Sequence, residues 1–129
     1  MTTWYHGTVA SLEPDDLITP GREANFDQSH SRRVYFTPVL GWAVFYACTV
    51  AAPNLVPHVY EVRPIAGRVF RDPNSQFWGD VRDRQARWSS QPLIVVREIP
   101  LTPELLRRAS RLMSRMEASV RRMELEAAK

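Results

Sequence analysis

The order of short apolar segments constrains the fold of this chain more than any other feature. Residues 3–5, 34–36, 59–62, 68–70 and 92–99 are predicted strands, and the last of these, PLIVVREI, is the strongest. A helix is predicted from Pro38 through residues 42–52, because proline is tolerated in the first turn of a helix. Strands and helices do not alternate regularly, so the order favours an α+β fold over a doubly wound sheet.

Size and composition are those of an ordinary globular domain. The chain has 129 residues, of which 44% are hydrophobic and 24% charged, enough for one domain with a hydrophobic core. No apolar run is long enough to span a bilayer, and the N-terminus, Met1-Thr2-Thr3-Trp4, lacks the features of a secretory signal. Cys48 is the single cysteine, so an internal disulfide is excluded. We therefore expect a cytoplasmic protein with no membrane partner.

The last quarter of the chain is predicted to be one long helix. Thr102-Pro103-Glu104 supplies a capping threonine, a proline at the first helical position and an early acid. Seven apolar residues then recur in alternating steps of three and four: Leu106, Ala109, Met113, Met116, Val120, Met123 and Ala127. Such a seam packs either on its own domain or on a second chain, so a monomer and a helix-mediated dimer both remain open. We favour residues 101–129 packing on the domain formed by residues 1–100.

The basic residues are concentrated in this helix. Net charge is +3, and six arginines lie between Arg107 and Arg122. A basic stripe can attract nucleic acid, but glutamates at 104, 117, 124 and 126 interleave with the arginines. This pattern is more typical of a solvated helix face, so nucleic acid is not the favoured partner.

Several kinds of site are excluded by spacing. The five glycines do not form a G-x-G-x-x-G or P-loop pattern, and no G-x-S-x-G nucleophile motif is present. The histidines at positions 6, 30 and 58 show no metal-ligand spacing, so no metal is expected. Cys48 lies among apolar residues of a predicted helix and is expected to be an inert core residue.

Three runs of residues place polar or aromatic side chains where a predicted strand meets a turn: Tyr5-His6-Gly7-Thr8, Val34-Tyr35-Phe36-Thr37 and Asp72-Pro73-Asn74. Taken singly, each has an ordinary explanation, as a strand-end histidine, a core tyrosine and a turn aspartate. A fold that gathered them would hold an imidazole, a phenol and a carboxylate in one cleft. That set suits a ligand with ribose hydroxyls, a flat cationic ring and a bond to break.

These runs are accompanied, in order, by further matching segments: Asp16-Leu17-Ile18-Thr19, Val59-Tyr60-Glu61-Val62, Ser89 and Pro92-Leu93-Ile94-Val95. The series resembles the small bacterial rifamycin ADP-ribosyltransferases, in the His-Tyr-Asp/Glu branch of NAD-dependent ADP-ribosyltransferases, over roughly residues 4 to 99. The resemblance implies a compact split β-sheet with flanking helices. It also implies NAD as co-substrate, without a metal, and transfer of ADP-ribose to a rifamycin hydroxyl, which inactivates the antibiotic and confers resistance.

The resemblance also implies residue roles. His6 would bond a ribose hydroxyl of NAD, the Gly7 backbone would hold the nicotinamide carboxamide, and Tyr35 would stack on the nicotinamide ring. Asp72 would bond the 2′-hydroxyl of the nicotinamide ribose and stabilise an oxocarbenium-like transition state. The implied catalytic residues are thus His6, Tyr35 and Asp72, and the implied NAD-binding residues are His6, Gly7, Thr8, Tyr35, Thr37 and Ser89.

Residues 75–91 depart from the family pattern, and this concerns the acceptor more than NAD. Residues 75–90 are predicted to be a loop with room for one helical turn, and they contain several large aromatic residues. A wide cleft for a rifamycin could be lined by Trp42, Phe77, Trp78 and Trp88, each of which alone could equally be a packing residue. Two alternatives remain: an ADP-ribosyltransferase acting on RNA ends or on protein, as a toxin or phage effector, and a non-catalytic nucleic-acid-binding module.

Overall fold

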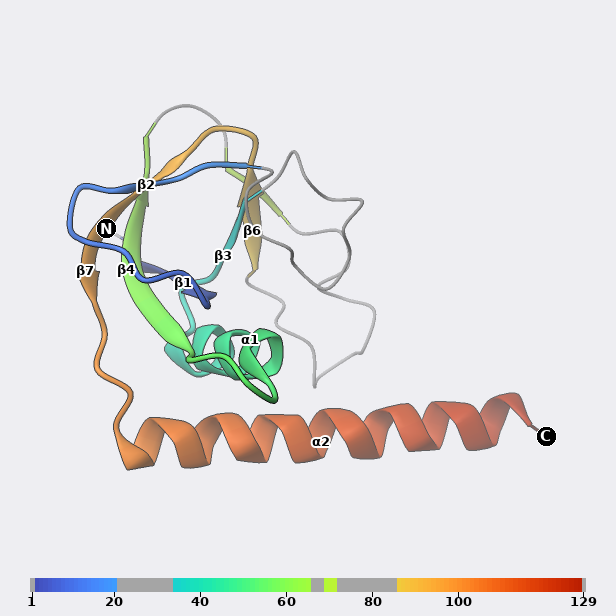
Figure 1. Ribbon diagram of the computed structural model, residues 1–129. Coiled ribbons are helices and arrows are strands. Elements are labelled where there is room, and N and C mark those ends of the chain that lie inside the picture. The colour runs from blue at the N-terminus through green and yellow to red at the C-terminus, as the bar shows by residue number, and fades with distance from the viewer. Residues whose placement is uncertain (1, 21–33, 66–68, 72–85, 129) are drawn as a thin grey trace.

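The computed structural model describes residues 2–20, 34–65, 69–71 and 86–128 of the chain. The fold is α+β, as predicted, with a curled antiparallel sheet, a second small sheet and two helices (Figure 1). The elements in chain order are β1 (Trp4–Thr8), β2 (Leu17–Ile18), β3 (Val34–Phe36), α1 (Leu40–Ala51), β4 (His58–Pro64), β5 (Phe70–Arg71), β6 (Arg87–Ser89), β7 (Leu93–Glu98) and α2 (Pro103–Ala127).

The larger sheet has the strand order β1-β4-β7-β2, and all of its neighbours are antiparallel. Side chains alternate between its two faces along β4. Val59 packs against the helices, whereas Tyr60 and Val62 belong to the core on the opposite face. Across to β1, Gly7 lies opposite Val59 and His6 lies opposite Tyr60. His6 therefore lies on the face of the sheet that is turned away from the helices.

The smaller sheet, β3-β6-β5, covers that second face. Val34 and Phe36 of β3 are buried with Tyr60, Leu93 and other residues of the larger sheet. The ring of Phe36 also meets Trp4 of β1 edge to face, with ring centroids 5.0 Å apart. The core between the two sheets is thus built from alternate residues of strands that are distant in sequence.

A β-bridge joins the edges of the two sheets. Tyr5 donates its amide hydrogen to the Thr37 carbonyl at 2.7 Å, and Thr37 returns the bond to Tyr5 at 2.9 Å. In the described part of the chain this bridge is isolated, and β1 and β3 form no longer ladder. The two sheets therefore separate immediately beyond Tyr5 and Thr37.

Helix α2 begins as predicted and docks through its N-terminal half. The Thr102 hydroxyl accepts the Leu105 amide hydrogen at 3.2 Å, and proline occupies the first turn. Ala109 is buried in the core with α1, and the residues that pack around it are Leu105, Leu112, Met113 and Met116. The N-terminal half of α2 therefore packs against α1.

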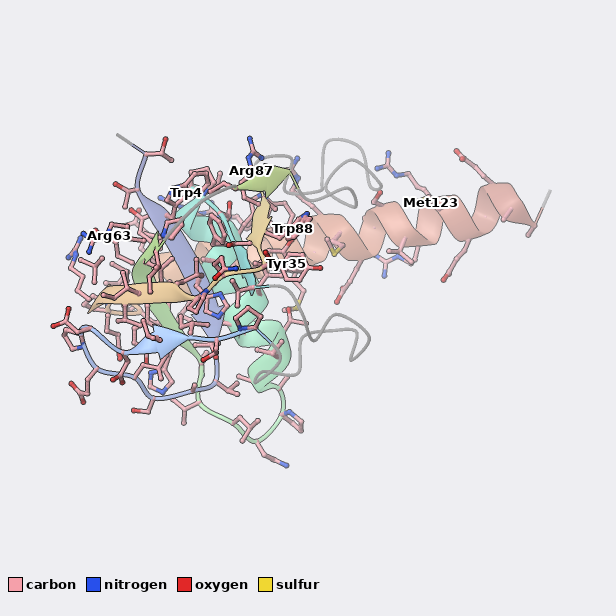
Figure 2. The ribbon with its side chains drawn as sticks, turned by 90° about the horizontal axis from the view of Figure 1, so that it is seen from above. Trp4, Tyr35, Arg63, Arg87, Trp88 and Met123 are labelled. Carbon is pink, nitrogen blue, oxygen red and sulfur yellow. The ribbon has the colours of Figure 1, made fainter. Side chains whose placement is uncertain are left out.

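The predicted seam was wrong at Leu106, whose side chain is 41% exposed. Leu105 and Leu112 take part in the packing instead, because the domain contacts a broader stripe than a coiled-coil seam. Ser119 is still buried, whereas the C-terminal end of α2, which carries Met123, extends past the labelled strands and α1 (Figures 1 and 2). Met123 is 39% exposed and Leu125 is 67% exposed.

Other sequence predictions needed smaller corrections. Strand β1 continues through Thr8, whereas residues 3–5 were predicted, because β4 offers pairing partners along its whole length. Residues 87–89, which were predicted to lie in a loop, form β6, since β3 supplies a ladder that no local pattern reveals. Among the described residues, no helix is long and apolar enough to cross a membrane.

Candidate active site

His6 and Tyr35 meet where the two sheets separate. The bridge at Tyr5 and Thr37 directs the backbone groups of both strands toward each other, and in a continued ladder Gly7 would next bond Tyr35. The His6 ring takes that place: its Nδ1 lies 2.6 Å from the Tyr35 carbonyl oxygen. Because a carbonyl can only accept, Nδ1 is the donor, and in the neutral ring Nε2 is then the acceptor nitrogen.

This arrangement leaves the backbone of Gly7 at an edge of β1 that no described strand continues to pair. The Val59 carbonyl opposite Gly7 accepts the Ile99 amide and so points away from β1. The amide and carbonyl of Gly7 therefore point along the same edge as those of Tyr5. Among the described residues, none forms a main-chain hydrogen bond with Gly7 on that edge. One donor and one acceptor thus lie side by side next to the His6 ring.

Glycine at position 7 is also required by packing. A Cβ built there would overlap the Ala43 carbonyl oxygen and lie 2.8 Å from the Ala47 amide nitrogen. Helix α1 therefore presses its backbone directly against β1. The same turn of α1 carries Tyr46, a half-buried aromatic residue that we did not single out from the sequence.

The three hydroxyl residues predicted to bind NAD have local bonding roles. Thr8, Thr37 and Ser89 are all buried. Each hydroxyl accepts the backbone amide two residues later, at 3.1, 3.1 and 3.0 Å respectively. These turns fix the chain as it leaves β1, β3 and β6. The three hydroxyls therefore lie at the ends of strands, where each one bonds the backbone of the turn that follows.

The aromatic residues predicted for the site separate into two groups. Tyr35 and Trp88 lie directly opposite each other on β3 and β6, both half-buried, and on the face of the small sheet opposite to Val34 and Phe36 (Figure 2). Trp42 is instead buried in the core of the helices, where its ring meets Phe45 at a centroid distance of 5.2 Å. The structure therefore pairs Trp88 with Tyr35 and gives Trp42 a packing position.

Three predicted site residues, Asp72, Phe77 and Trp78, lie outside the described residues. Within the described part of the chain, no group of three histidine, cysteine or acidic side chains is placed to hold a metal ion. Cys48 is half-buried against the helix core, and burial raises the pKa of its thiol. Such a thiol is mostly neutral at neutral pH, which suits an inert packing residue.

Sequence reasoning also missed Tyr60. This residue is 0% exposed and lies opposite His6 on the same face of the sheet. Its hydroxyl bonds the segment that follows β1, as described below. The available signal was an aromatic residue in the middle of a predicted buried strand, where a phenol needs a polar partner.

A split antiparallel sheet, with a histidine on one half joined to a tyrosine on the other, is the arrangement expected of an ADP-ribosyltransferase. The family model described as rifampin ADP-ribosyl transferase (Arr-ms) matches residues 4–101. The chain belongs to this family, and the match includes every strand of both sheets together with α1. No curated protein matches the chain.

Proposed function

We propose that the protein transfers ADP-ribose from NAD to a hydroxyl group of a rifamycin. The observation that carries this proposal is the hydrogen bond from His6 Nδ1 to the Tyr35 carbonyl. It orients the imidazole and leaves the Gly7 amide and carbonyl at the open edge of β1. The family match supports the same conclusion, because it names both the reaction and the acceptor.

The open edge is complementary to a primary carboxamide. The carboxamide of nicotinamide carries one acceptor oxygen and two donor hydrogens, so it can bond the Gly7 amide and carbonyl together. With the carboxamide at Gly7, the ribose would lie toward His6, whose Nε2 can accept a hydroxyl hydrogen. Tyr35 then offers its ring to the flat, positively charged nicotinamide.

The proposed reaction replaces one bond with another at the anomeric carbon. The C1′–N bond of NAD breaks, and its electron pair leaves with nicotinamide, which becomes neutral. The acceptor oxygen forms a new bond to C1′ and releases its proton. Positive charge develops on the ribose between these events, and a carboxylate next to it stabilises the transition state more than the ground state. We assign that carboxylate to Asp72, which is also the candidate base for the acceptor proton.

A rifamycin is a bulky, largely apolar acceptor with an aromatic ring system. Trp88, which lies opposite Tyr35, provides an apolar surface next to the proposed nicotinamide site. We assign Trp88 to the acceptor side, together with Phe77 and Trp78, and expect the reaction to occur in the cytoplasm as an antibiotic-resistance activity.

The test is NAD consumption with and without a rifamycin. The purified protein is incubated with NAD and rifampin. Released nicotinamide is quantified by chromatography, and the molecular mass of the drug is measured by mass spectrometry. We expect nicotinamide release that depends on rifampin and a drug product heavier by one ADP-ribosyl group. The matched control is His6→Ala, in which both signals should fall together.

Two results would overturn the proposal in different ways. NAD consumption that is unaffected by rifampin but labels RNA ends or protein would keep the reaction and change the acceptor. Absence of NAD binding by calorimetry in the wild-type protein would overturn the reaction itself.

A further inference from the structure

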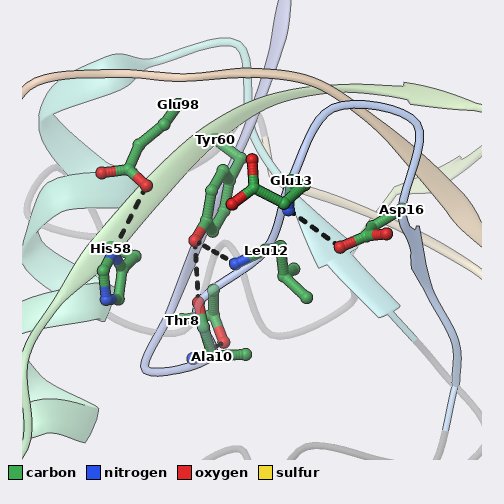
Figure 3. A network of polar contacts seen from close by, with 8 residues as sticks. All are labelled: Thr8, Ala10, Leu12, Glu13, Asp16, His58, Tyr60 and Glu98. Atoms are coloured by element: carbon green, nitrogen blue, oxygen red, sulfur yellow. Dashed lines mark hydrogen bonds and ion pairs between the residues drawn. The ribbon is translucent and has the colours of Figure 1, made fainter.

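Tyr60 holds the segment that follows the His6-Gly7-Thr8 run. Its hydroxyl donates to the Ala10 carbonyl at 2.9 Å and accepts the Leu12 amide at 2.8 Å (Figure 3). Residues 10 and 12 lie about fifty positions away in sequence. This single oxygen therefore joins β4 to the segment that follows β1. Because the Tyr60 side chain is fully buried, water competes less with these two bonds than with bonds at the surface.

The remainder of the segment is fastened at both of its ends. Near β1, the Thr8 hydroxyl accepts the Ala10 amide at 3.1 Å. Near β2, Asp15 donates to the Val95 carbonyl at 2.8 Å, and Val95 donates to the Asp16 carbonyl at 2.9 Å. Between these anchors, the Tyr60 hydroxyl bonds both Ala10 and Leu12. Its hydroxyl therefore fixes the centre of the segment.

The Tyr60 ring is itself held in place. His58 stacks on it, with ring centroids 6.0 Å apart and an angle of 13° between the planes. His58 in turn lies 3.5 Å from a Glu98 carboxylate oxygen, across the sheet on β7 (Figure 3). Tyr60 is also the register partner of His6, so the two side chains lie next to each other on one face. Movement of the tyrosine would disturb both His6 and the exit of β1.

We propose that Tyr60 is a positioning residue for NAD binding. Its hydroxyl holds residues 10–12, and thereby keeps His6, Gly7 and Thr8 in the geometry that the dinucleotide requires. The inference rests on the proposed function, because it assigns the same site to NAD. Tyr60 itself does not touch the reacting atoms.

The test is Tyr60→Phe, which keeps the ring and removes the oxygen. The matched control is Tyr5→Phe, which removes a tyrosine hydroxyl from β1 on the opposite face of the sheet, toward the helices. Steady-state kinetics are measured separately for NAD and for rifampin, and NAD affinity is measured by calorimetry. We expect Tyr60→Phe to raise both KM and Kd for NAD about tenfold, with kcat and the KM for rifampin within about twofold. Tyr5→Phe should leave all four values unchanged.

A second measurement reports directly on the bonds of the Tyr60 hydroxyl to residues 10 and 12. Hydrogen exchange of the Leu12 amide should accelerate in Tyr60→Phe, because the bond that protects this amide is lost. If Tyr60→Phe does not fold, His58→Ala, which removes the stacked ring, takes its place. We expect that variant to raise the KM for NAD about threefold, the effect of losing one stacking contact.

The outcomes separate this inference from the proposed function. A melting temperature that falls while NAD affinity stays at the wild-type value would show that Tyr60 is a packing residue, and would overturn the inference alone. A wild-type protein that does not bind NAD would overturn the proposed function, and this inference with it.

Discussion

A side chain takes over a backbone role at the centre of the site. In a continuous sheet, the Tyr35 carbonyl would accept an amide hydrogen from β1, whereas here it accepts the hydrogen of the His6 ring. The replacement has two effects at once. It gives the Tyr35 carbonyl a hydrogen-bond donor, and among the described residues the Gly7 amide and carbonyl keep no main-chain partner on this edge. The His6 ring therefore links β1 to β3 and at the same time takes the place of a main-chain bond from Gly7.

Gly7 should not tolerate any side chain. In Gly7→Ala the added methyl group would overlap the backbone of α1 at Ala43 and Ala47, which cannot move aside as a flexible side chain can. We expect the free energy of unfolding to fall by about 3 kcal/mol or more. Urea denaturation followed by circular dichroism measures this loss. The comparison is Gly41→Ala, where the nearest atom is the flexible Arg108 side chain at 3.2 Å, and the cost should be smaller. Equal losses would contradict the close approach of α1 to β1.

Tyr35 should contribute its ring rather than its hydroxyl to NAD binding. Tyr35→Ala is expected to weaken NAD binding by about 1–3 kcal/mol, the scale of aromatic stacking on a base. Tyr35→Phe keeps the ring and should bind NAD nearly as tightly as the wild-type protein. Calorimetry with both variants is the measurement. Unchanged affinity in Tyr35→Ala would remove this residue from the nucleotide site.

At the scale of secondary-structure elements, α2 has a docked half and an extended half. Met113 packs against the core with α1, whereas Met123 is 39% exposed. Met113→Glu would place an unpaired charge against apolar side chains and should cost about 2 kcal/mol or more. Met123→Glu should change stability by less than about 0.5 kcal/mol. Thermal melting compares the two variants, and light scattering records whether Met123→Glu changes the oligomeric state. Large, equal losses in both would show that the whole helix is docked.

Elements that depend on neighbouring residues could be predicted from the sequence, whereas those that depend on contacts between distant segments could not. The start of α2 was predictable because the Thr102 cap and Pro103 act within one turn. The docking face of α2 was not, since Leu105 and Leu106 are equally apolar and the choice depends on how α2 crosses α1 at Gly41. Strand β6 was missed because its three residues gain their structure from β3.

The site was predictable to a similar extent. The three runs named His6 and Tyr35, and the structure brings these two together. It could not be read from the sequence that His6 bonds the backbone of Tyr35, because such a bond depends on the point where two sheets separate. Tyr60 was missed for the same reason: its partners, Ala10 and Leu12, are set by the path of the chain after β1.

At the scale of the whole molecule, the proposed reaction needs a carboxylate, which we assign to Asp72. In Asp72→Asn the shape of the side chain is kept and its charge is removed. We expect kcat to fall by about a hundredfold or more, with NAD affinity within a few fold of the wild type, because the charge acts on the transition state. Single-turnover kinetics and calorimetry separate the two effects. Near-normal turnover in this variant would rule out the catalytic role proposed for Asp72.

The isolated bridge at Tyr5 and Thr37 joins the edges of the two sheets through main-chain bonds, directly beside Gly7 and Tyr35. In the proposed binding mode, a dinucleotide would contact Gly7 on one sheet and Tyr35 on the other, and its binding energy would add to the packing between the two sheets. At a concentration a hundred times its Kd, NAD would stabilise the folded state by about 2.7 kcal/mol. The amides of Tyr5 and Thr37, which form the bridge, should then exchange with solvent more slowly, while those buried deep in the larger sheet change little. Bound NAD would then strengthen the contact between the two sheets as well as supply the ADP-ribosyl group.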